Sequence, residues 1–240
     1  MAEHGLLQIL SMGVIIMKKN NSERLKALLC LSMMAALAIA ADVFLRIPGI
    51  GGFLSYEPKD VILTISGFIF GPIAGVILSL VVCIVEMLTV STTGLIGLLM
   101  NFISSAVFVG VSTAFYAKKK TLPRAILGLV VGSLSMTVIM LLWNYIITPI
   151  YMSIPRAAVL ELFVPLLIPF NLLKTALNSA LVVFLYKGVV TALRKSKLIP
   201  ETQSDAQVKK ANTALIVSVS ALLAVTLTLV VLLFAGILKF

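Results

Sequence analysis

Long apolar runs alternate with short polar segments along this chain. Since about 20 apolar residues in a helix span the hydrocarbon core of a bilayer, the pattern predicts an all-α polytopic membrane protein. One run is broken by Gly71-Pro72, which predicts either one kinked helix or two short ones. The predicted spanning regions are residues 25–45, 61–90, 95–116, 125–147, 164–186 and 213–238.

Basic residues decide between one and two crossings in residues 61–90. With two crossings, only Arg46, Lys59, Arg156 and Lys239 lie on the poorer side. The richer side then holds Lys18, Lys19, Arg24, Lys26, Lys118, Lys119, Lys120, Arg124, Lys187, Arg194, Lys195, Lys197, Lys209 and Lys210. This asymmetry favours two crossings, with the basic loops in the cytoplasm. Residues 59–70 are then a short span.

The resulting organisation is a six-helix membrane domain with an additional C-terminal helix. We expect residues 1–16 to be an extension without assigned function and residues 17–195 to form the six-helix, substrate-binding domain. Residues 196–212 are a basic polar linker, and residues 213–240 contain a predicted seventh transmembrane helix.

Composition supports membrane insertion and excludes several function classes. The chain is 60% hydrophobic and 12% charged, with a mean hydropathy of +1.15. Its net charge of +10 comes from clusters between apolar runs, so nucleic-acid binding is not expected. Cys30 and Cys83 lie in apolar runs, and His4 is the one histidine, so no metal site or cofactor is expected. Asp42 and Glu86 are isolated carboxylates, which argues against an enzyme.

A lysine inside the run of residues 164–186 is the main functional signal. Lys174 should cost about 2.5–3.5 kcal/mol to insert. Asn171 and Asn178 share its helical face. That face must meet a polar cavity or the protein interior, and we interpret it as the floor of a small-molecule site. The alternative for Lys174 is a structural ion pair with Glu86 or Asp42.

Residues 46–60 are predicted to be irregular, because three glycines and two prolines oppose a helix. Phe53, Leu54 and Tyr56 suit a loop that caps a pocket, and the alternative is a plain connector. For Glu86 we favour a position near the outer interface over a pairing between helices. Residues 149–165 form a second predicted outer loop.

Two further features each have two interpretations. Asn144 lies among aromatic residues that could form an interfacial belt, and its amide is less easily explained by that belt. Ala36 and Ala40 are one turn apart, so another helix can approach them closely. That helix could belong to this chain or to a partner protein.

Three stretches of the chain carry a family resemblance. They are the alanine-rich first helix, the glycine-rich segment ending in Tyr56-Glu57-Pro58-Lys59-Asp60, and Trp143-Asn144-Tyr145 together with Phe170 to Lys174. Residues 24–195 resemble the substrate-binding S components of energy-coupling factor (ECF) vitamin transporters, most closely the riboflavin-specific ones.

The resemblance implies a pocket that is open to the outside and covered by the first loop. It implies that Asn144, Asn171 and Lys174 contact the flavin ring. It also implies that the alanine face docks onto a transmembrane T component driven by two ATPase subunits. The seventh helix and residues 1–16 depart from the family pattern.

The chemistry of these side chains agrees with such a ligand. The uracil-like edge of a flavin alternates acceptors with one N–H donor, which asparagine and lysine can match. An ammonium could equally meet a carboxylate, so another vitamin or small heteroaromatic is an alternative. An ion-coupled secondary transporter is less favoured, because internal repeats and several buried carboxylates are not evident. The chain has no Walker-type phosphate loop, so an ATP-driven motor would be another polypeptide.

Overall fold

The computed structural model describes residues 21–50, 54–91 and 93–198. Phe53, the predicted extension 1–16, most of the linker and the predicted seventh helix lie outside the described residues. The helices are α2 (Asn21–Leu45), α3 (Lys59–Phe70), α4 (Pro72–Thr89), α5 (Gly94–Lys118), α6 (Leu122–Met152), α7 (Arg156–Glu161) and α8 (Ile168–Lys195). A π-helical turn, η1 (Phe163–Leu167), precedes α8, and the strands are β1 (Ile47–Ile50) and β2 (Leu54–Tyr56).

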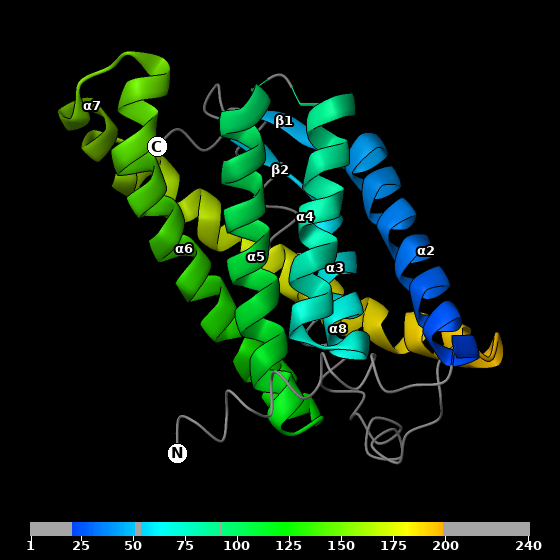
Figure 1. The fold of residues 1–240 in the computed structure, drawn as a ribbon. Helices are drawn as coiled ribbons and strands as arrows, with labels where there is room; N and C mark the ends of the chain where they lie inside the picture. The colour runs from blue at the N-terminus through cyan, green and yellow to red at the C-terminus, as the bar shows by residue number, and fades with distance from the viewer. Residues whose placement is uncertain (1–20, 51–53, 92, 199–240) are drawn as a thin grey trace.

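The helices form a bundle with α3 in its interior. In Figure 1, α4 and α5 stand side by side, with α6 tilted beyond α5 and α2 beyond α4. Helix α8 passes behind them from the α7 end to the start of α2. Helix α3 packs against α2, α4, α5 and α8. Most of its side chains are therefore buried among protein rather than exposed to lipid.

A tight helical hairpin at Gly71 confirms that residues 61–90 form two helices. Gly71 has φ 100° and ψ 164°, a conformation that favours glycine. Four residues to either side, Gly67 and Gly75 let the two backbones touch. A Cβ on Gly75 would lie 3.0 Å from the Gly67 Cα and 2.8 Å from Cγ1 of Val109.

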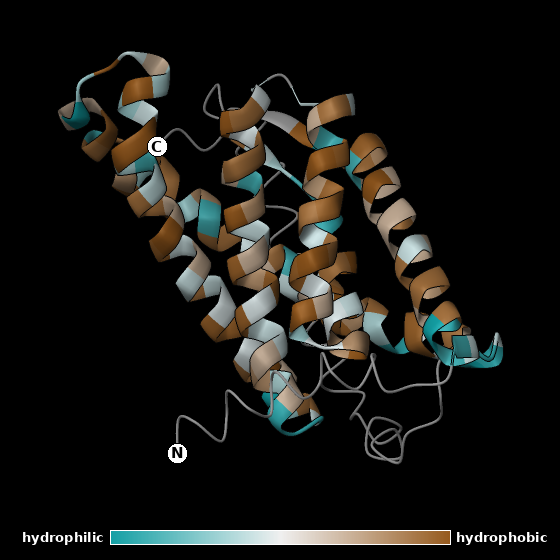
Figure 2. Cartoon of the chain, viewed as in Figure 1, coloured by the Kyte–Doolittle hydropathy of each residue, from teal (hydrophilic) through white to brown (hydrophobic). Residues whose placement is uncertain are grey.

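Five helical segments have the length and composition of membrane spans. Large apolar side chains are exposed on these segments, such as Phe44 on α2 at 82%, and Figure 2 shows mostly hydrophobic residues along α2 and α4. Helix α3, predicted to be a further crossing, has 12 residues and is therefore only about 18 Å long. The start of α2, the α5–α6 turn and the end of α8 lie at one end of the bundle, which gathers the described basic clusters there.

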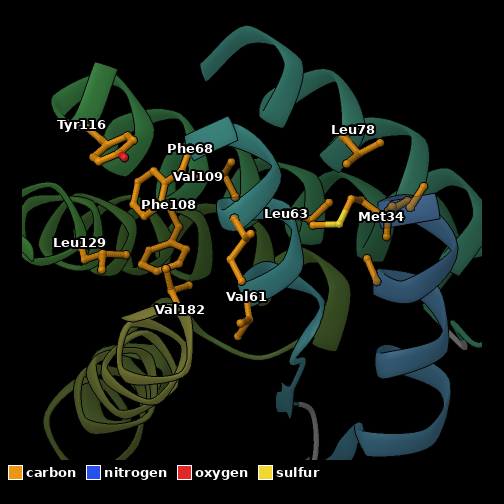
Figure 3. Packing of buried hydrophobic residues seen from close by; sticks show 14 of the residues in the cluster. Met34, Val61, Leu63, Phe68, Leu78, Phe108, Val109, Tyr116, Leu129 and Val182 are labelled. Atoms are coloured by element: carbon orange, nitrogen blue, oxygen red, sulfur yellow. The ribbon is translucent and has the colours of Figure 1, made fainter. Parts of the chain in front are cut away.

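The apolar core packs around α3 (Figure 3). On one side, Leu63 faces Met34 of α2 and Leu78 of α4. On the other side, the ring of Phe68 lies 4.5 Å from the ring of Tyr116, centroid to centroid. The core thus joins the N-terminal helices to α5 through one central helix.

Two segments predicted as loops contain regular structure. Residues 46–60 were expected to be irregular, but β1 and β2 pair antiparallel, with Ile47 opposite Tyr56. Helix α3 begins at Lys59, so Lys59 and Asp60 are buried helical residues rather than loop residues. The second predicted loop, 149–165, contains the end of α6, helix α7 and the first part of η1. Local sequence propensity did not predict these strands and helices, because tertiary packing stabilises them even where the segment contains proline and glycine.

The glycine contact between α3 and α4 can be tested by adding a single methyl group. We expect Gly75→Ala to lower the free energy of unfolding by about 1–3 kcal/mol, because the added Cβ overpacks the contact. Gly188→Ala on α8 is the matched control, since its Cβ would meet nothing within 4 Å and alanine favours a helix. Thermal unfolding in detergent measures both variants, and equal melting temperatures would contradict the close packing.

Candidate functional site

A cavity lies between the β-hairpin and helices α5, α6 and α8, at the end of the bundle opposite the basic clusters. Its volume is about 460 Å³, within the roughly 300–1,000 Å³ typical of small-molecule sites. The residues that line it are Arg46, Leu54, Ser55, Glu57, Thr93, Ile96, Gly97, Met100, Asn101, Ser104, Met136, Met140, Trp143, Asn144, Ile147, Thr148, Tyr151, Met152, Phe170, Asn171 and Lys174. The lining is thus mixed, with apolar walls and a charged end.

At the charged end, Glu57 holds three cations together. Nζ of Lys174 donates to Oε2 of Glu57 at 3.1 Å, and Nη2 of Arg46 donates to Oε1 at 3.2 Å. Nζ of Lys59 forms an ion pair with Oε2 of the same carboxylate, at 3.2 Å. Glu57 is only 2% exposed and follows β2 directly. The carboxylate therefore ties the hairpin to α3 and α8.

Glu86 anchors the other side of this cluster. It accepts from Nη1 of Arg46 at 2.9 Å and from Nδ2 of Asn101 at 2.6 Å, and it pairs with Lys59. The prediction of an interfacial Glu86 is therefore wrong, because the side chain is 3% exposed and paired between helices. Asp60 accepts from the Ser105 hydroxyl at 2.5 Å, and Oδ2 of Asp42, also buried, lies 3.7 Å from Nη1 of Arg46.

The surrounding charges keep Glu57 ionised. Burial alone would raise the pKa of its carboxyl, but the cations Lys174, Lys59 and Arg46 outweigh burial and lower the pKa to about 2. Breaking such a buried pair by removing one partner typically costs about 3–5 kcal/mol. Within the described ranges, no cluster of three or more histidine, cysteine, aspartate or glutamate side chains is arranged to hold a metal ion.

The two predicted asparagines face the cavity from α6 and α8. Nδ2 of Asn144 donates to the Met140 carbonyl at 2.7 Å, and its Oδ1 accepts from the Thr148 hydroxyl at 2.9 Å. Nδ2 of Asn171 donates to the Leu167 carbonyl at 2.7 Å. Each amide is thereby fixed in orientation and keeps one N–H available for a ligand.

Aromatic and methionine side chains form the walls. Trp143 and Phe170 come from α6 and α8, the two helices that carry the asparagines. Met136 and Met140 lie deeper, at 1% and 5% exposure. Flat apolar surfaces beside polarizable thioethers suit a planar heteroaromatic ligand.

The other predicted site residues have different placements. Leu54 lines the cavity and is 4% exposed. Tyr56 does not line it, and its hydroxyl instead donates to Oδ1 of Asn178 at 2.9 Å, which anchors the hairpin to α8. Lys174 lines the cavity and also forms an ion pair, but with Glu57 rather than with Glu86 or Asp42.

Sequence reasoning missed several polar residues of the cavity. Arg46 and Glu57 lie in the segment predicted to be irregular, and Asn101 and Ser104 of α5 were not among the predicted site residues. A signal was present: each is a charged or polar side chain in or near an apolar run, where an unpaired polar group is costly. Their pairing was not predictable, because the partners are far apart in sequence, as for Glu57 and Lys174.

The alanine face of α2 lies on the outside of the bundle. Ala36 is exposed and Ala40 half-buried. Leu37, between them, is 55% exposed, and Met33 one turn earlier is 52% exposed. In the described part of the chain this face is exposed, so another membrane helix can reach it.

Comparison with known proteins identifies relatives of known function. The chain is 29% identical to the riboflavin transporter RibU of Staphylococcus aureus, over 74% of this chain and 97% of the relative. It is 27% identical to the riboflavin transporter FmnP of Bacillus subtilis, over 63% of this chain and 85% of the relative.

A solved structure supports the same relationship. It is described as the S component of a bacterial ECF transporter, and it superimposes with a TM-score of 0.60 at 28% identity, covering 71% of this chain and 98% of the other. The family model described as "ECF transporter, substrate-specific component" matches residues 26–186, which is more than half of the chain. The chain therefore belongs to the substrate-specific, or S, components of ECF transporters.

Proposed function

We propose that this chain captures riboflavin from outside a bacterial cell and holds it in the cavity beneath the β-hairpin. The observation that carries the proposal is the cavity itself. It combines aromatic walls with two amides, Asn144 and Asn171, and the ammonium of Lys174. The names of the relatives from S. aureus and B. subtilis point to the same ligand.

The ligand fits because its polar edge and its ring need different surroundings. The ring would lie against Trp143 and Phe170, while the uracil-like edge would meet Asn144, Asn171 and Lys174. Buried polar groups of this kind give specificity, since a ligand without matching atoms leaves them unpaired. Leu54 would cover the bound vitamin, and the same role predicted for Phe53 falls outside the described residues.

Transport would need partner proteins. The exposed face around Ala36 and Ala40 would dock onto a T component, and two ATPase subunits would supply energy. The basic end of the bundle would lie in the cytoplasm, which places the hairpin and cavity at the outer side. The chain would act as a binding protein rather than an enzyme, with riboflavin as cargo and no resident cofactor.

The first test is an absorption and fluorescence spectrum of the detergent-purified chain offered riboflavin. We expect saturable quenching of flavin fluorescence. In Lys174→Met, we expect the Kd to rise about 10–100-fold, because one hydrogen bond from a charged donor is lost. Lys187→Met, an exposed change on the same helix, is the control and should leave the Kd unchanged.

Two results would contradict this proposal. If the wild-type chain neither copurifies with a yellow chromophore nor quenches riboflavin, the ligand is a different vitamin. If Lys174→Met binds riboflavin as tightly as Lys187→Met does, Lys174 serves only the ion pair with Glu57.

The docking face generates a separate prediction. Replacing Ala36 and Ala40 with leucine should abolish riboflavin uptake in cells that also make the T component and ATPases, because bulky side chains prevent close helix approach. Binding by the purified variant should be unchanged. Val130→Leu on the outer face of α6, which is 51% exposed, is the control. Loss of both uptake and binding would indicate a folding defect, and normal uptake would exclude this face as the docking site.

A further inference from the structure

Glu57 retains one unused acceptor position at the cavity wall. A carboxylate offers about four lone-pair sites. Arg46 occupies one site on Oε1 at 3.2 Å, while Lys59 at 3.2 Å and Lys174 at 3.1 Å share Oε2. Glu57 itself lines the cavity. Oε1 can therefore accept one more hydrogen bond, and a ligand in the cavity that Glu57 lines could donate it.

Lys174 offers donors directly beside this acceptor. An ammonium has three N–H donors. Among the described residues, Nζ donates one hydrogen bond, to Glu57. Lys174 also lines the cavity, so its remaining donors lie next to the carboxylate that it already contacts. The wall thus presents a donor and an acceptor side by side.

A donor beside an acceptor is the complement of a carbonyl beside an N–H. We infer that Glu57 and Lys174 together recognise an imide edge, with Glu57 accepting the ligand N–H and Lys174 donating to the adjacent carbonyl. This inference rests on the proposed function and extends it. It makes Glu57 a specificity-determining residue and restricts the ligand class to cyclic imides with an unsubstituted N–H.

Asn171 is the competing acceptor for the same N–H. Its Nδ2 is held by the Leu167 carbonyl, but no hydrogen bond within the described residues engages its Oδ1. Oδ1 of Asn144 already accepts from Thr148. A carboxylate is the stronger acceptor, because a hydrogen bond to a charged group contributes roughly twice as much as one between neutral groups. The experiment must separate Glu57 from Asn171.

The test compares riboflavin with 3-methylriboflavin, in which a methyl group replaces the imide N–H. Fluorescence titration of the wild-type chain should give a Kd for the methylated ligand that is roughly tenfold or more higher. In Glu57→Gln this ratio should fall to within about threefold. The three cations would bind the single carbonyl oxygen of glutamine. Its NH2 group would then face the ligand N–H, where the wild-type chain has an acceptor.

Asn171→Ala is the matched control, which should weaken both ligands and leave their ratio at the wild-type value. A wild-type ratio near one would overturn the inference while leaving riboflavin binding intact. The inference would also be overturned if the Kd ratio stays at its wild-type value in Glu57→Gln but falls to near one in Asn171→Ala. If Glu57→Gln does not fold, a ratio retained in both Asn171→Ala and Asn144→Ala supports Glu57, and a ratio lost in either overturns it. A wild-type chain that binds no riboflavin removes the proposed function and this inference together.

Discussion

The structure depends on one buried carboxylate shared by three cations. Glu57 joins Arg46 next to the hairpin, Lys59 at the start of α3 and Lys174 in α8. None of these charges could be buried alone without a cost of several kcal/mol. Together they satisfy one another, so the elements that surround the cavity are held by the same set of contacts. Stability and the shape of the binding site are therefore coupled at Glu57.

The glycine contact between α3 and α4 makes this cluster possible. Because Gly67 and Gly75 bring the two backbones together, the start of α3 and the end of α4 lie side by side. Lys59 and Glu86 occupy those two ends and pair with each other. A wider hairpin would separate the two charges and leave each buried without its partner.

The helices and part of the site were predictable, because they depend on local properties. Apolar runs define the spans, and the cost of burying Lys174 alone pointed to a polar cavity. The hairpin was not predictable, because β1 contains proline and glycine and β2 is held by contacts with a distant helix, such as that of Tyr56 with Asn178. Glu57 was missed for a similar reason. Its partner Lys174 lies on another element, and no spacing rule links the two positions.

The short length of α3 has a consequence for how a ligand reaches the cavity. At about 18 Å it ends well before a hydrocarbon core of about 30 Å does, and the β-hairpin occupies the depth that remains. Strand backbone at that depth is tolerated only against protein or water, since lipid cannot satisfy its polar groups. Water must therefore reach any part of this backbone that protein does not cover. A solute that follows this water would reach the cavity from the aqueous phase along the hairpin, rather than by lateral diffusion out of the bilayer.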